Sequence, residues 1–264
     1  MNNLHPKKSL GQHWLFDVGS LNAMAEAAEV NSGDAILEVG PGLGTLTEVL
    51  LSHGANVTAV EFDKDLYENL ISKSSQLSGL DKSHLTVINE DILQFDLSSL
   101  PKNYKVCANI PYYLTSNLIR RMLECNNPPS VMALMIQKEV AERIIATPGQ
   151  MSILSVATQF YAEVELRELV PAQLFTPPPK VDSQIIQIKL RSKPLFPDVD
   201  SEKFFKIVKA GFSEKRKKLR SSLSGGLRIS KNDADELIGR AKIVPGSRAQ
   251  ELTLKQWYEL TKVY

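Results

Sequence analysis

The sequence predicts an α/β protein in which a doubly wound, mostly parallel sheet is followed by a small all-α domain. Two observations predict the sheet. Strand-like and helix-like segments alternate from residue 35 to residue 137, and a glycine-rich loop joins the first of these strands to its helix. A third observation predicts the second domain, because beyond residue 200 the apolar residues recur only at helical spacing.

The elements of the first domain follow from the period of the apolar residues. Helical spacing over residues 17–28 predicts a first helix ahead of the sheet. Segments 162–170 and 183–190 alternate like strands, and a hairpin there is expected to add an antiparallel edge. Between the first helix and this hairpin, the pattern predicts strands at 35–40, 55–62, 85–93, 105–110 and 131–137, and helices at 45–52, 65–77, from 116, and at 139–146.

A change of composition marks the domain boundary. The segment SKPLFPDVD, residues 192–200, is polar and interrupted by two prolines. Helical spacing follows it at 204–212 and in the segments DADELIGRA and TLKQWYEL. We therefore predict a first domain at 1–192 and a helical, basic domain at 193–264.

Length and composition exclude several classes of protein. With 264 residues, 43% of them hydrophobic, the chain can bury a full core in one large and one small domain. Two cysteines and four scattered histidines favour neither a disulfide framework nor a metal site. The longest apolar run, residues 131–136, is far shorter than the ~20 residues of a membrane helix, and no apolar export segment is present. A cytoplasmic protein with no membrane partner is expected.

The loop GPGLG places Gly40, Gly42 and Gly44 between the first strand and its helix. Glycine permits positive φ and lets a ligand approach bare backbone, and the helix N-terminus offers free N–H groups. Glu61, ending the second strand, suits a ribose hydroxyl, and Asp91, after the third, suits an adenine amino group. The spacing GxGxG differs from the dinucleotide pattern GxGxxG and favours a Rossmann-like domain that binds S-adenosylmethionine. A purely structural tight turn stays open.

The segment NIPY, residues 109–112, follows the fourth strand at the sheet edge where open α/β folds bind ligands. An exocyclic amine of a base is a poor nucleophile, because its lone pair is delocalised into the ring. The Asn109 side chain and the Ile110 carbonyl can accept both amino hydrogens. Pro111 fixes the backbone, and Tyr112 offers a ring on which a base can stack. The segment predicts methyl transfer achieved mainly by positioning; a strand-ending turn with half-buried tyrosines is the alternative.

Motifs along almost the whole chain carry a resemblance to a known family. In order they are KKSLGQHWLFD, EVGPGLGTLT, VEFD, NEDIL, NIPYYLTS, MIQKEVAERI, LFTPPPKVDSQI, FSEKRKKLRSSL and RAQELTLKQWYEL. With these motifs the chain closely resembles the ribosomal RNA adenine dimethyltransferases, especially the bacterial small-subunit type. The resemblance implies transfer of two methyl groups to N6 of each of two adjacent adenosines in the 3′-terminal hairpin of 16S rRNA. A role in small-subunit biogenesis is also implied.

The resemblance also assigns residues to the site. It makes residues 109–112 the target-amine site, and it makes Phe175 the aromatic that sandwiches the target adenine against Tyr112. The family commonly has Asn where this chain has His13. The cofactor contacts that the resemblance implies are His13, Leu15, Gly40, Glu61, Asp91 and Asn109.

Charge is sorted along the chain despite a net charge of +1. Residues 1–200 hold 16 Lys and Arg against 23 Asp and Glu, whereas residues 201–264 hold 15 against 7. A polyanionic partner for the basic quarter is expected, with a solvated helical surface as the alternative. In a predicted helix, Leu219 and Leu223 would pack inward, and the residues expected to contact RNA phosphates are Lys215, Arg216, Lys217, Lys218 and Arg220.

Three rival functions stay open beside the expected one. The expected partner is rRNA within the small ribosomal subunit or its precursor, bound by a monomer. A large-subunit rRNA adenine methyltransferase of the antibiotic-resistance type would share the core motifs, but the C-terminal motifs favour the small subunit. A non-catalytic RNA-binding assembly factor would have lost the activity, and the intact Glu61, Asp91 and Asn109 argue against this. A nicotinamide oxidoreductase gives no reason for the NIPYY segment.

Overall fold

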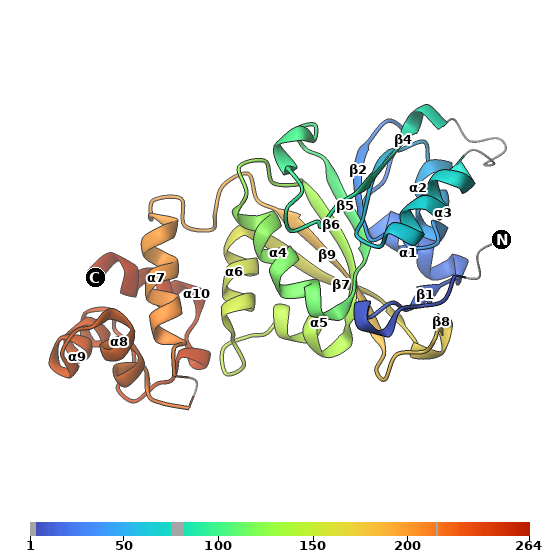
Figure 1. Ribbon diagram of the computed structural model, residues 1–264. Coiled ribbons are helices and arrows are strands. Elements are labelled where there is room, and N and C mark those ends of the chain that lie inside the picture. Colours follow the sequence, from blue (N-terminus) through green and yellow to red (C-terminus); the bar gives the residue numbers. More distant parts are fainter. Residues whose placement is uncertain (1–3, 75–81, 215) are drawn as a thin grey trace. The chain divides into compact units, whose positions relative to one another are not determined.

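The computed structural model describes residues 4–74, 82–214 and 216–264. Seven strands form the main sheet in the order β4-β3-β2-β5-β6-β9-β7, and a second, two-stranded sheet pairs β1 with β8 (Figure 1). The strands are β1 Trp14–Leu15, β2 Ala35–Val39, β3 Asn56–Glu61, β4 Leu85–Asn89, β5 Lys105–Asn109, β6 Val131–Gln137, β7 Ala162–Val170, β8 Phe175–Thr176 and β9 Ser183–Leu190.

The order of the strands confirms the predicted doubly wound sheet. Strands β4, β3, β2, β5 and β6 are parallel, and β9 runs antiparallel to β6, with Leu134 opposite Ile186. The predicted antiparallel edge is therefore present: β9 pairs with β6, and its neighbour β7 is the outermost strand. The chain order reverses between the neighbours β2 and β5, and the carboxyl ends at such a switch point form a crevice for ligands.

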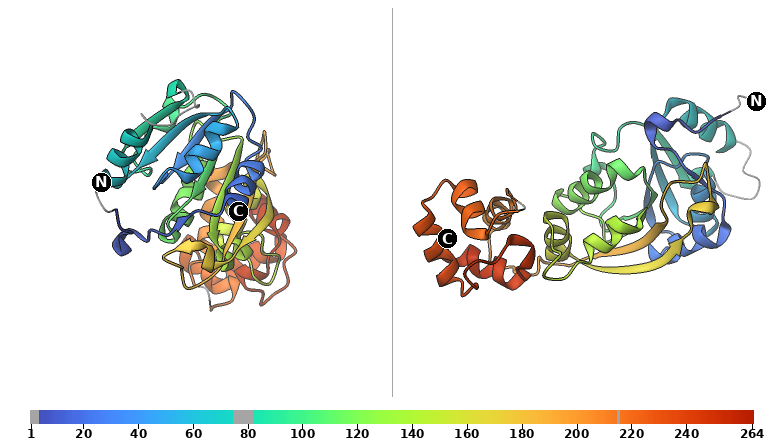
Figure 2. Two further views of the ribbon diagram at one scale, coloured as in Figure 1. Left: turned by 90° about the vertical axis from the view of Figure 1, so that its right-hand side faces the viewer. Right: turned by 90° about the horizontal axis from the view of Figure 1, so that it is seen from below.

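Helices lie on both faces of the main sheet (Figures 1 and 2). On one face, Leu21 and Met24 of α1 and Leu50 of α2 pack in one buried cluster with Ala133 and Ile185 of the strands. Residues 75–77 of the predicted helix at 65–77 lie outside the described residues. The helices are α1 Val18–Ala27, α2 Thr45–Ser52, α3 Lys64–Ser74, α4 Thr115–Glu124, α5 Lys138–Ile144, α6 Ile153–Tyr161, α7 Ser201–Gly211, α8 Leu219–Leu227, α9 Lys231–Arg240 and α10 Leu254–Val263.

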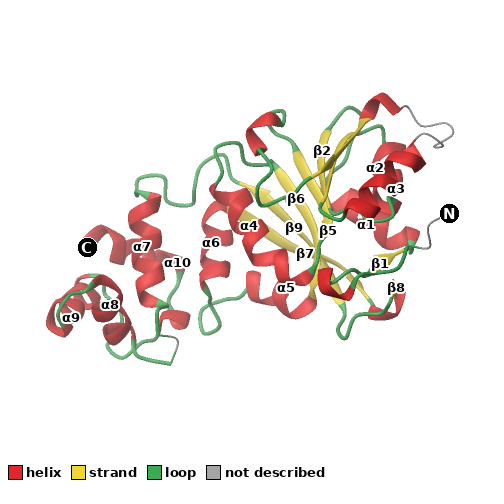
Figure 3. Ribbon diagram, viewed as in Figure 1, coloured by secondary structure: helices red, strands yellow, loops and turns green. Residues whose placement is uncertain are grey.

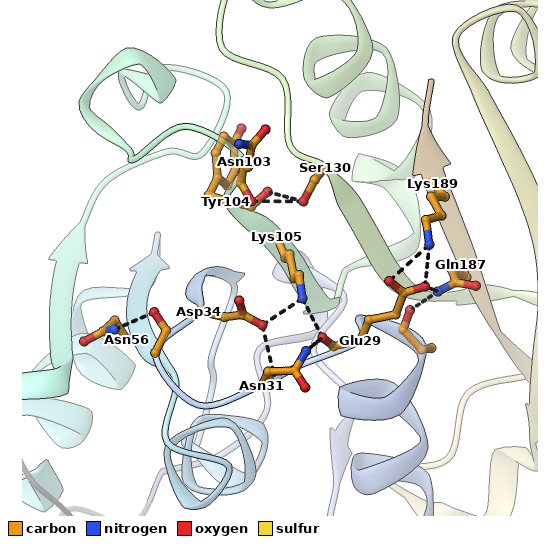
Figure 4. Close-up of polar contacts among 12 residues, drawn as sticks. Glu29, Asn31, Asp34, Asn56, Asn103, Tyr104, Lys105, Ser130, Gln187 and Lys189 are labelled. Carbon is orange, nitrogen blue, oxygen red and sulfur yellow. Dashed lines mark hydrogen bonds and ion pairs between the residues drawn. The ribbon is translucent and has the colours of Figure 1, made fainter. Parts of the chain in front are cut away.

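Ion pairs fix the connection between α1 and β2 at the amino end of the sheet (Figure 4). The Lys105 ammonium lies 2.7 Å from Asp34 and also donates to the Glu29 carbonyl oxygen. The Glu29 carboxylate in turn accepts from Lys189 at 2.9 Å and from Gln187 at 3.1 Å. These contacts tie the connection to β5 and β9 and leave the opposite, carboxyl end of the strands free for the site.

The chain divides into two compact units. The first comprises residues 1–141 and 163–190, and the second comprises residues 142–162 and 191–264. The sequence predicts a domain boundary between residues 192 and 193. This is two residues after the last change of unit, which lies between residues 190 and 191. Within the described part of residues 191–264 the regular elements are helices, and none is a strand (Figure 3).

Helix α6 is an element that the sequence analysis missed. Its Phe160 is fully buried and stacks on Phe204 of α7, with 4.5 Å between ring centroids. The helix belongs to the core of the second unit, which also contains Leu219, Leu223 and Trp257. The capping box of Ser152 and Ser155, in which each side chain bonds the backbone N–H of the other, was the local signal for its start.

Candidate active site

A cavity of about 220 Å³ in the first unit brings the predicted residues together. Its wall contains the ends of β2, β3 and β5, the turn after β4, and the N-terminal segment around β1. Gly44 is the one predicted cofactor residue that does not line it. The predicted residues in the wall are His13, Leu15, Gly40, Gly42, Glu61, Asp91, Asn109, Ile110, Pro111, Tyr112 and Phe175.

The three glycines of the loop have different physical roles. All adopt left-handed φ, at 66°, 59° and 83° for Gly40, Gly42 and Gly44. A Cβ added at Gly40 would meet no atom within 4 Å, so the bare backbone there faces open space. A Cβ at Gly44 would lie 2.7 Å from Leu70 Cδ1, so Leu70 of α3 packs closely against this glycine. Gly44 therefore does not line the cavity, and its assignment to the cofactor stays a prediction.

The Glu61 carboxylate is held in one orientation at the end of β3. Its Oε1 accepts the Asp63 N–H at 2.8 Å, and its Oε2 accepts the Gly42 N–H at 3.1 Å. Burial raises the pKa of Glu61, and the two N–H groups oppose this by favouring the ionised form. A carboxylate fixed at the cavity wall in this way can accept hydrogen bonds from paired hydroxyls, such as those of a ribose.

Asp91 is oriented by its own turn. Its Oδ1 accepts the Leu93 N–H at 2.9 Å, and its carbonyl oxygen accepts the N–H groups of Gln94 and Phe95. Among the described residues no hydrogen bond occupies the other carboxylate oxygen, which is left as an acceptor that suits an amino group. Together with Glu61 and the open backbone at Gly40, the residues present fit an adenosine-type cofactor.

Glu38 lines the same cavity, and sequence reasoning did not identify it. The residue is 1% exposed; Oε2 accepts the Thr47 hydroxyl at 2.6 Å, and Oε1 has no hydrogen-bond partner in the described part of the chain. Burial raises the pKa of Glu38 from 4.5 to about 8. We therefore predict that Glu38 is mostly neutral in the folded protein at pH 7.

A Glu38→Gln variant tests this protonation state through the free energy of unfolding. Below about pH 4.5 the carboxyl is neutral in both states, and its contribution to stability is fully present. Between pH 4.5 and 8 the unfolded chain ionises while the folded chain stays neutral, so wild type should lose stability relative to Glu38→Gln as the pH rises. The pKa difference sets an upper bound of about 5 kcal/mol, and we expect about 1–3 kcal/mol between pH 5 and pH 8 in urea titrations.

Glu48→Gln is the matched control, because Glu48 is an exposed residue of α2. This control should follow wild type at both pH values. A stability difference between Glu38→Gln and wild type that stays the same from pH 5 to pH 8 would show that Glu38 is ionised in the folded state.

Asn109 ends β5 with its side chain at the cavity. Its amide nitrogen donates to the His13 carbonyl oxygen at 3.5 Å, a long contact that orients the side chain. Because a carbonyl oxygen can only accept, the NH₂ group of Asn109 faces it, and Oδ1 is left as an acceptor. The neighbouring Tyr112 hydroxyl bonds Ser183 at 2.9 Å, which fixes the ring. Burial raises the pKa of Tyr112, so this hydroxyl stays protonated.

The two-stranded sheet brings Phe175 and His13 to this part of the wall. Leu15 pairs with Phe175 and Trp14 pairs with Thr176, and the His13 Nδ1 lies 2.7 Å from the Pro177 carbonyl oxygen. That oxygen only accepts, so Nδ1 carries a proton. The His13 ring stacks on Tyr112, with 6.0 Å between centroids and an angle of 23° between planes. Aromatic rings from distant parts of the chain thus share one cavity.

The basic segment of the second unit is not helical as predicted. Helix α8 begins at Leu219, and the residues before it form a turn in which the Lys217 N–H donates to the Glu214 carbonyl oxygen. Lys215 lies outside the described residues. Arg220 forms an ion pair with Asp235 at 2.8 Å. Arg216, Lys217 and Lys218 are exposed and form no ion pair in the described part of the chain.

Neither a group of metal-binding side chains nor a membrane-spanning helix is found in the described ranges. Within residues 4–74, 82–214 and 216–264, no three His, Cys, Asp or Glu side chains are grouped so that they could hold a metal ion. No helix in these ranges has the length and apolar character needed to span a bilayer.

The strand order and the cavity at its switch point define a Rossmann-like fold with a ligand site, and the residues in its wall fit the class of methyltransferases that use S-adenosylmethionine. Two solved structures support this class. A dimethyladenosine transferase from Plasmodium falciparum matches with a TM-score of 0.76 and 25% identity, covering 94% of this chain and 96% of that one. The 23S rRNA methyltransferase ErmE matches with a TM-score of 0.73 and 28% identity, covering 95% and 98%.

Sequence comparison gives the family. The model of the family described as ribosomal RNA adenine dimethylase matches residues 3–264. Proteins named ribosomal RNA small subunit methyltransferase A are 38% identical in Dehalococcoides mccartyi strain 195 and 35% identical in Clostridioides difficile strain 630, each over 99% of this chain and 89% or 91% of the relative. The chain belongs to the ribosomal RNA adenine dimethylase family and is an enzyme that dimethylates rRNA adenines with S-adenosylmethionine as methyl donor.

Proposed function

We propose that the enzyme dimethylates N6 of two adjacent adenosines in the 3′-terminal hairpin of 16S rRNA. It would act as a monomer in the cytoplasm, on the small ribosomal subunit or its precursor, and so contribute to subunit biogenesis. The observation that carries this proposal is one cavity lined both by Glu61 and Asp91 and by the NIPY segment. The names of the relatives, small subunit methyltransferase A, support the choice of subunit.

The cofactor half of the cavity is assigned to residues that are held in place before binding. S-adenosylmethionine, when bound, supplies a methyl group on a sulfonium. Glu61 accepts hydrogen bonds from the ribose hydroxyls, and Asp91 accepts one from the adenine amino group. The backbone at Gly40 and Gly42 lets the cofactor approach closely, and His13 and Leu15 complete the wall.

Glu61→Ala should weaken S-adenosylmethionine binding by about 10- to 100-fold, because a carboxylate accepting two hydroxyls contributes about 1.5–3 kcal/mol. Calorimetric titration measures the affinity, and circular dichroism checks the fold. Glu68→Ala is the matched control, since Glu68 is exposed on α3 and does not line the cavity. Unchanged affinity in folded Glu61→Ala would remove Glu61 from the cofactor site.

The substrate half is assigned to the NIPY segment and Phe175. The Asn109 Oδ1 and the Ile110 carbonyl accept the two amino hydrogens and make the nitrogen more tetrahedral, while the base stacks between Tyr112 and Phe175. As the new N–C bond forms, the C–S bond of the sulfonium would break and a neutral thioether would leave; the nitrogen becomes acidic and releases one proton to water. No strong general base is needed, and the rate depends on how well the amine is positioned.

We assign the RNA contact to residues 193–264, and within them to the turn before α8. Reversing Arg216, Lys217 and Lys218 to Glu should weaken RNA binding and reduce the slope of log affinity against log salt by about two to three, roughly 0.7–0.9 for each lost phosphate contact. Filter binding at several salt concentrations measures the slope. Lys255→Glu, an exposed residue of α10, is the control for a general change of charge. An unchanged slope in the triple variant would mean that the turn is only solvated.

A large-subunit substrate is the second candidate. The structural match to a 23S rRNA methyltransferase, at 28% identity over 95% of this chain, favours it. Offering unmethylated small and large subunits to the enzyme in parallel distinguishes the two, and we expect methyl transfer to the small subunit alone.

A further inference from the structure

The N-terminal segment forms one wall of the cavity and has few polar contacts with the rest of the unit. Its residues 10–15 all line the cavity. From Trp14 onward the segment is held by its pairing with β8, and the Thr45 hydroxyl donates to the Leu15 carbonyl oxygen at 2.9 Å. Ahead of this point, the side-chain contacts that residues 4–12 make with other described elements converge on Asp63 and Asp65.

Asp63 accepts from this segment with both carboxylate oxygens. The Lys7 ammonium lies 2.7 Å from its Oδ1, and the Gln12 amide donates to its Oδ2 at 3.0 Å. Lys7 also reaches Asp65 at 2.7 Å, and its own backbone N–H donates to the Gln12 side chain at 2.8 Å. Lys7 and Gln12 therefore brace each other and close the segment onto the start of α3.

The anchor is more strongly constrained than an ordinary surface ion pair. The Asp63 side chain is 3% exposed, whereas that of Lys7 is 43% exposed. Burial alone would raise the pKa of Asp63, but the bonds from Lys7 and Gln12 hold it below its ordinary value. The same residue uses its backbone N–H to orient the Glu61 carboxylate at 2.8 Å. One residue thus joins the N-terminal wall to the acid that we assign to the ribose.

We propose that Lys7 and Gln12, clasped to Asp63, hold the N-terminal segment closed over the cofactor and set how long the cofactor stays bound. The inference rests on the proposed assignment of the cavity to S-adenosylmethionine. Lys7 and Gln12 are positioning residues, because neither needs to touch the reacting atoms. If the clasp is lost, the segment spends part of its time open, and the apparent dissociation constant equals that of the closed state divided by the fraction of time that the segment is closed.

The test compares Lys7→Met with Lys8→Met, a matched change at an exposed neighbour that has no ion pair in the described residues. Lys7→Met should raise the dissociation constant of S-adenosylmethionine about 3- to 10-fold, mostly through faster dissociation. Calorimetry gives the affinity, and a chase of labelled cofactor gives the rate. Lys7→Arg should restore the affinity to within about twofold, because it keeps the charge and the donors.

A structural role alone would not give the same set of results. In Lys7→Met, KM for S-adenosylmethionine should rise while kcat at saturating cofactor falls less than about twofold. Amide hydrogen exchange of residues 10–15 should be faster than in wild type, with the melting temperature nearly unchanged. If Lys7→Met binds as tightly as wild type while Glu61→Ala binds weakly, the clasp has no such role and the cavity assignment stands. If neither variant changes affinity, the cavity assignment fails and the clasp fails with it.

Discussion

Replacing Asn109 with alanine should lower the rate of methyl transfer at least about 100-fold, the largest loss expected for any single side chain of the site. The Oδ1 of Asn109 is the acceptor that the structure leaves free, because the amide nitrogen is turned to the His13 carbonyl. Without it, one amino hydrogen of the target has no partner and the nitrogen lone pair is less well aimed. Single-turnover rates with unmethylated subunits measure the effect.

The control for Asn109 must separate chemistry from cofactor binding, because both depend on this residue in our account. Asn109→Asp keeps an acceptor oxygen and should retain clearly more activity than Asn109→Ala. Both variants are compared at cofactor concentrations that saturate them, as judged by calorimetry. A rate for Asn109→Ala within tenfold of wild type, with cofactor bound, would contradict the assigned role.

Tyr112→Ala should lower turnover at least about tenfold while the affinity for S-adenosylmethionine barely changes. The ring supplies a stacking surface for the base, and such stacking is worth about 1–3 kcal/mol per base in single-strand binding proteins. The loss should appear in kcat/KM for RNA, because the variant still folds and still binds the cofactor.

Tyr112→Phe is the matched control, because it keeps the ring and removes only the hydroxyl that bonds Ser183 at 2.9 Å. That bond contributes about 0.5–1.5 kcal/mol to stability, so a lower melting temperature is expected together with much of the activity. Equal activity of Tyr112→Ala and wild type would mean that the target base stacks elsewhere.

Local sequence patterns were sufficient to predict the sheet and most of its ligand-binding edge. The run at 35–40 predicts a strand because it is apolar and ends at a glycine loop, and the structure places β2 at Ala35–Val39. Glu61, Asp91 and Asn109 each follow a strand, so the parallel order of β2 to β5 brings them to the same edge. These residues meet because the strands are parallel, and the alternation of strands and helices along the sequence already implies a parallel sheet.

Contacts between distant segments could not be predicted in the same way. The pairing of Leu15 with Phe175 joins residues 160 positions apart, and neither two-residue strand has a period of its own. The role of Gly44 depends on Leu70 of another helix, and Lys7 reaches Asp63 only after the sheet has formed. The turn before α8 was mistaken for helix because charged residues carry no apolar period that would reveal where the helix begins.

The central claim is that the enzyme dimethylates adenines of small-subunit rRNA at this cavity, and one measurement tests this claim most directly. Small subunits that lack the modification are incubated with the enzyme and labelled S-adenosylmethionine, and the rRNA is then digested for quantitative nucleoside analysis. With excess cofactor, the account predicts N6,N6-dimethyladenosine as the final product, four methyl groups per subunit, two on each of two adjacent adenosines near the 3′ end. Product that stops at monomethyladenosine, or label that enters only the large subunit, would contradict it.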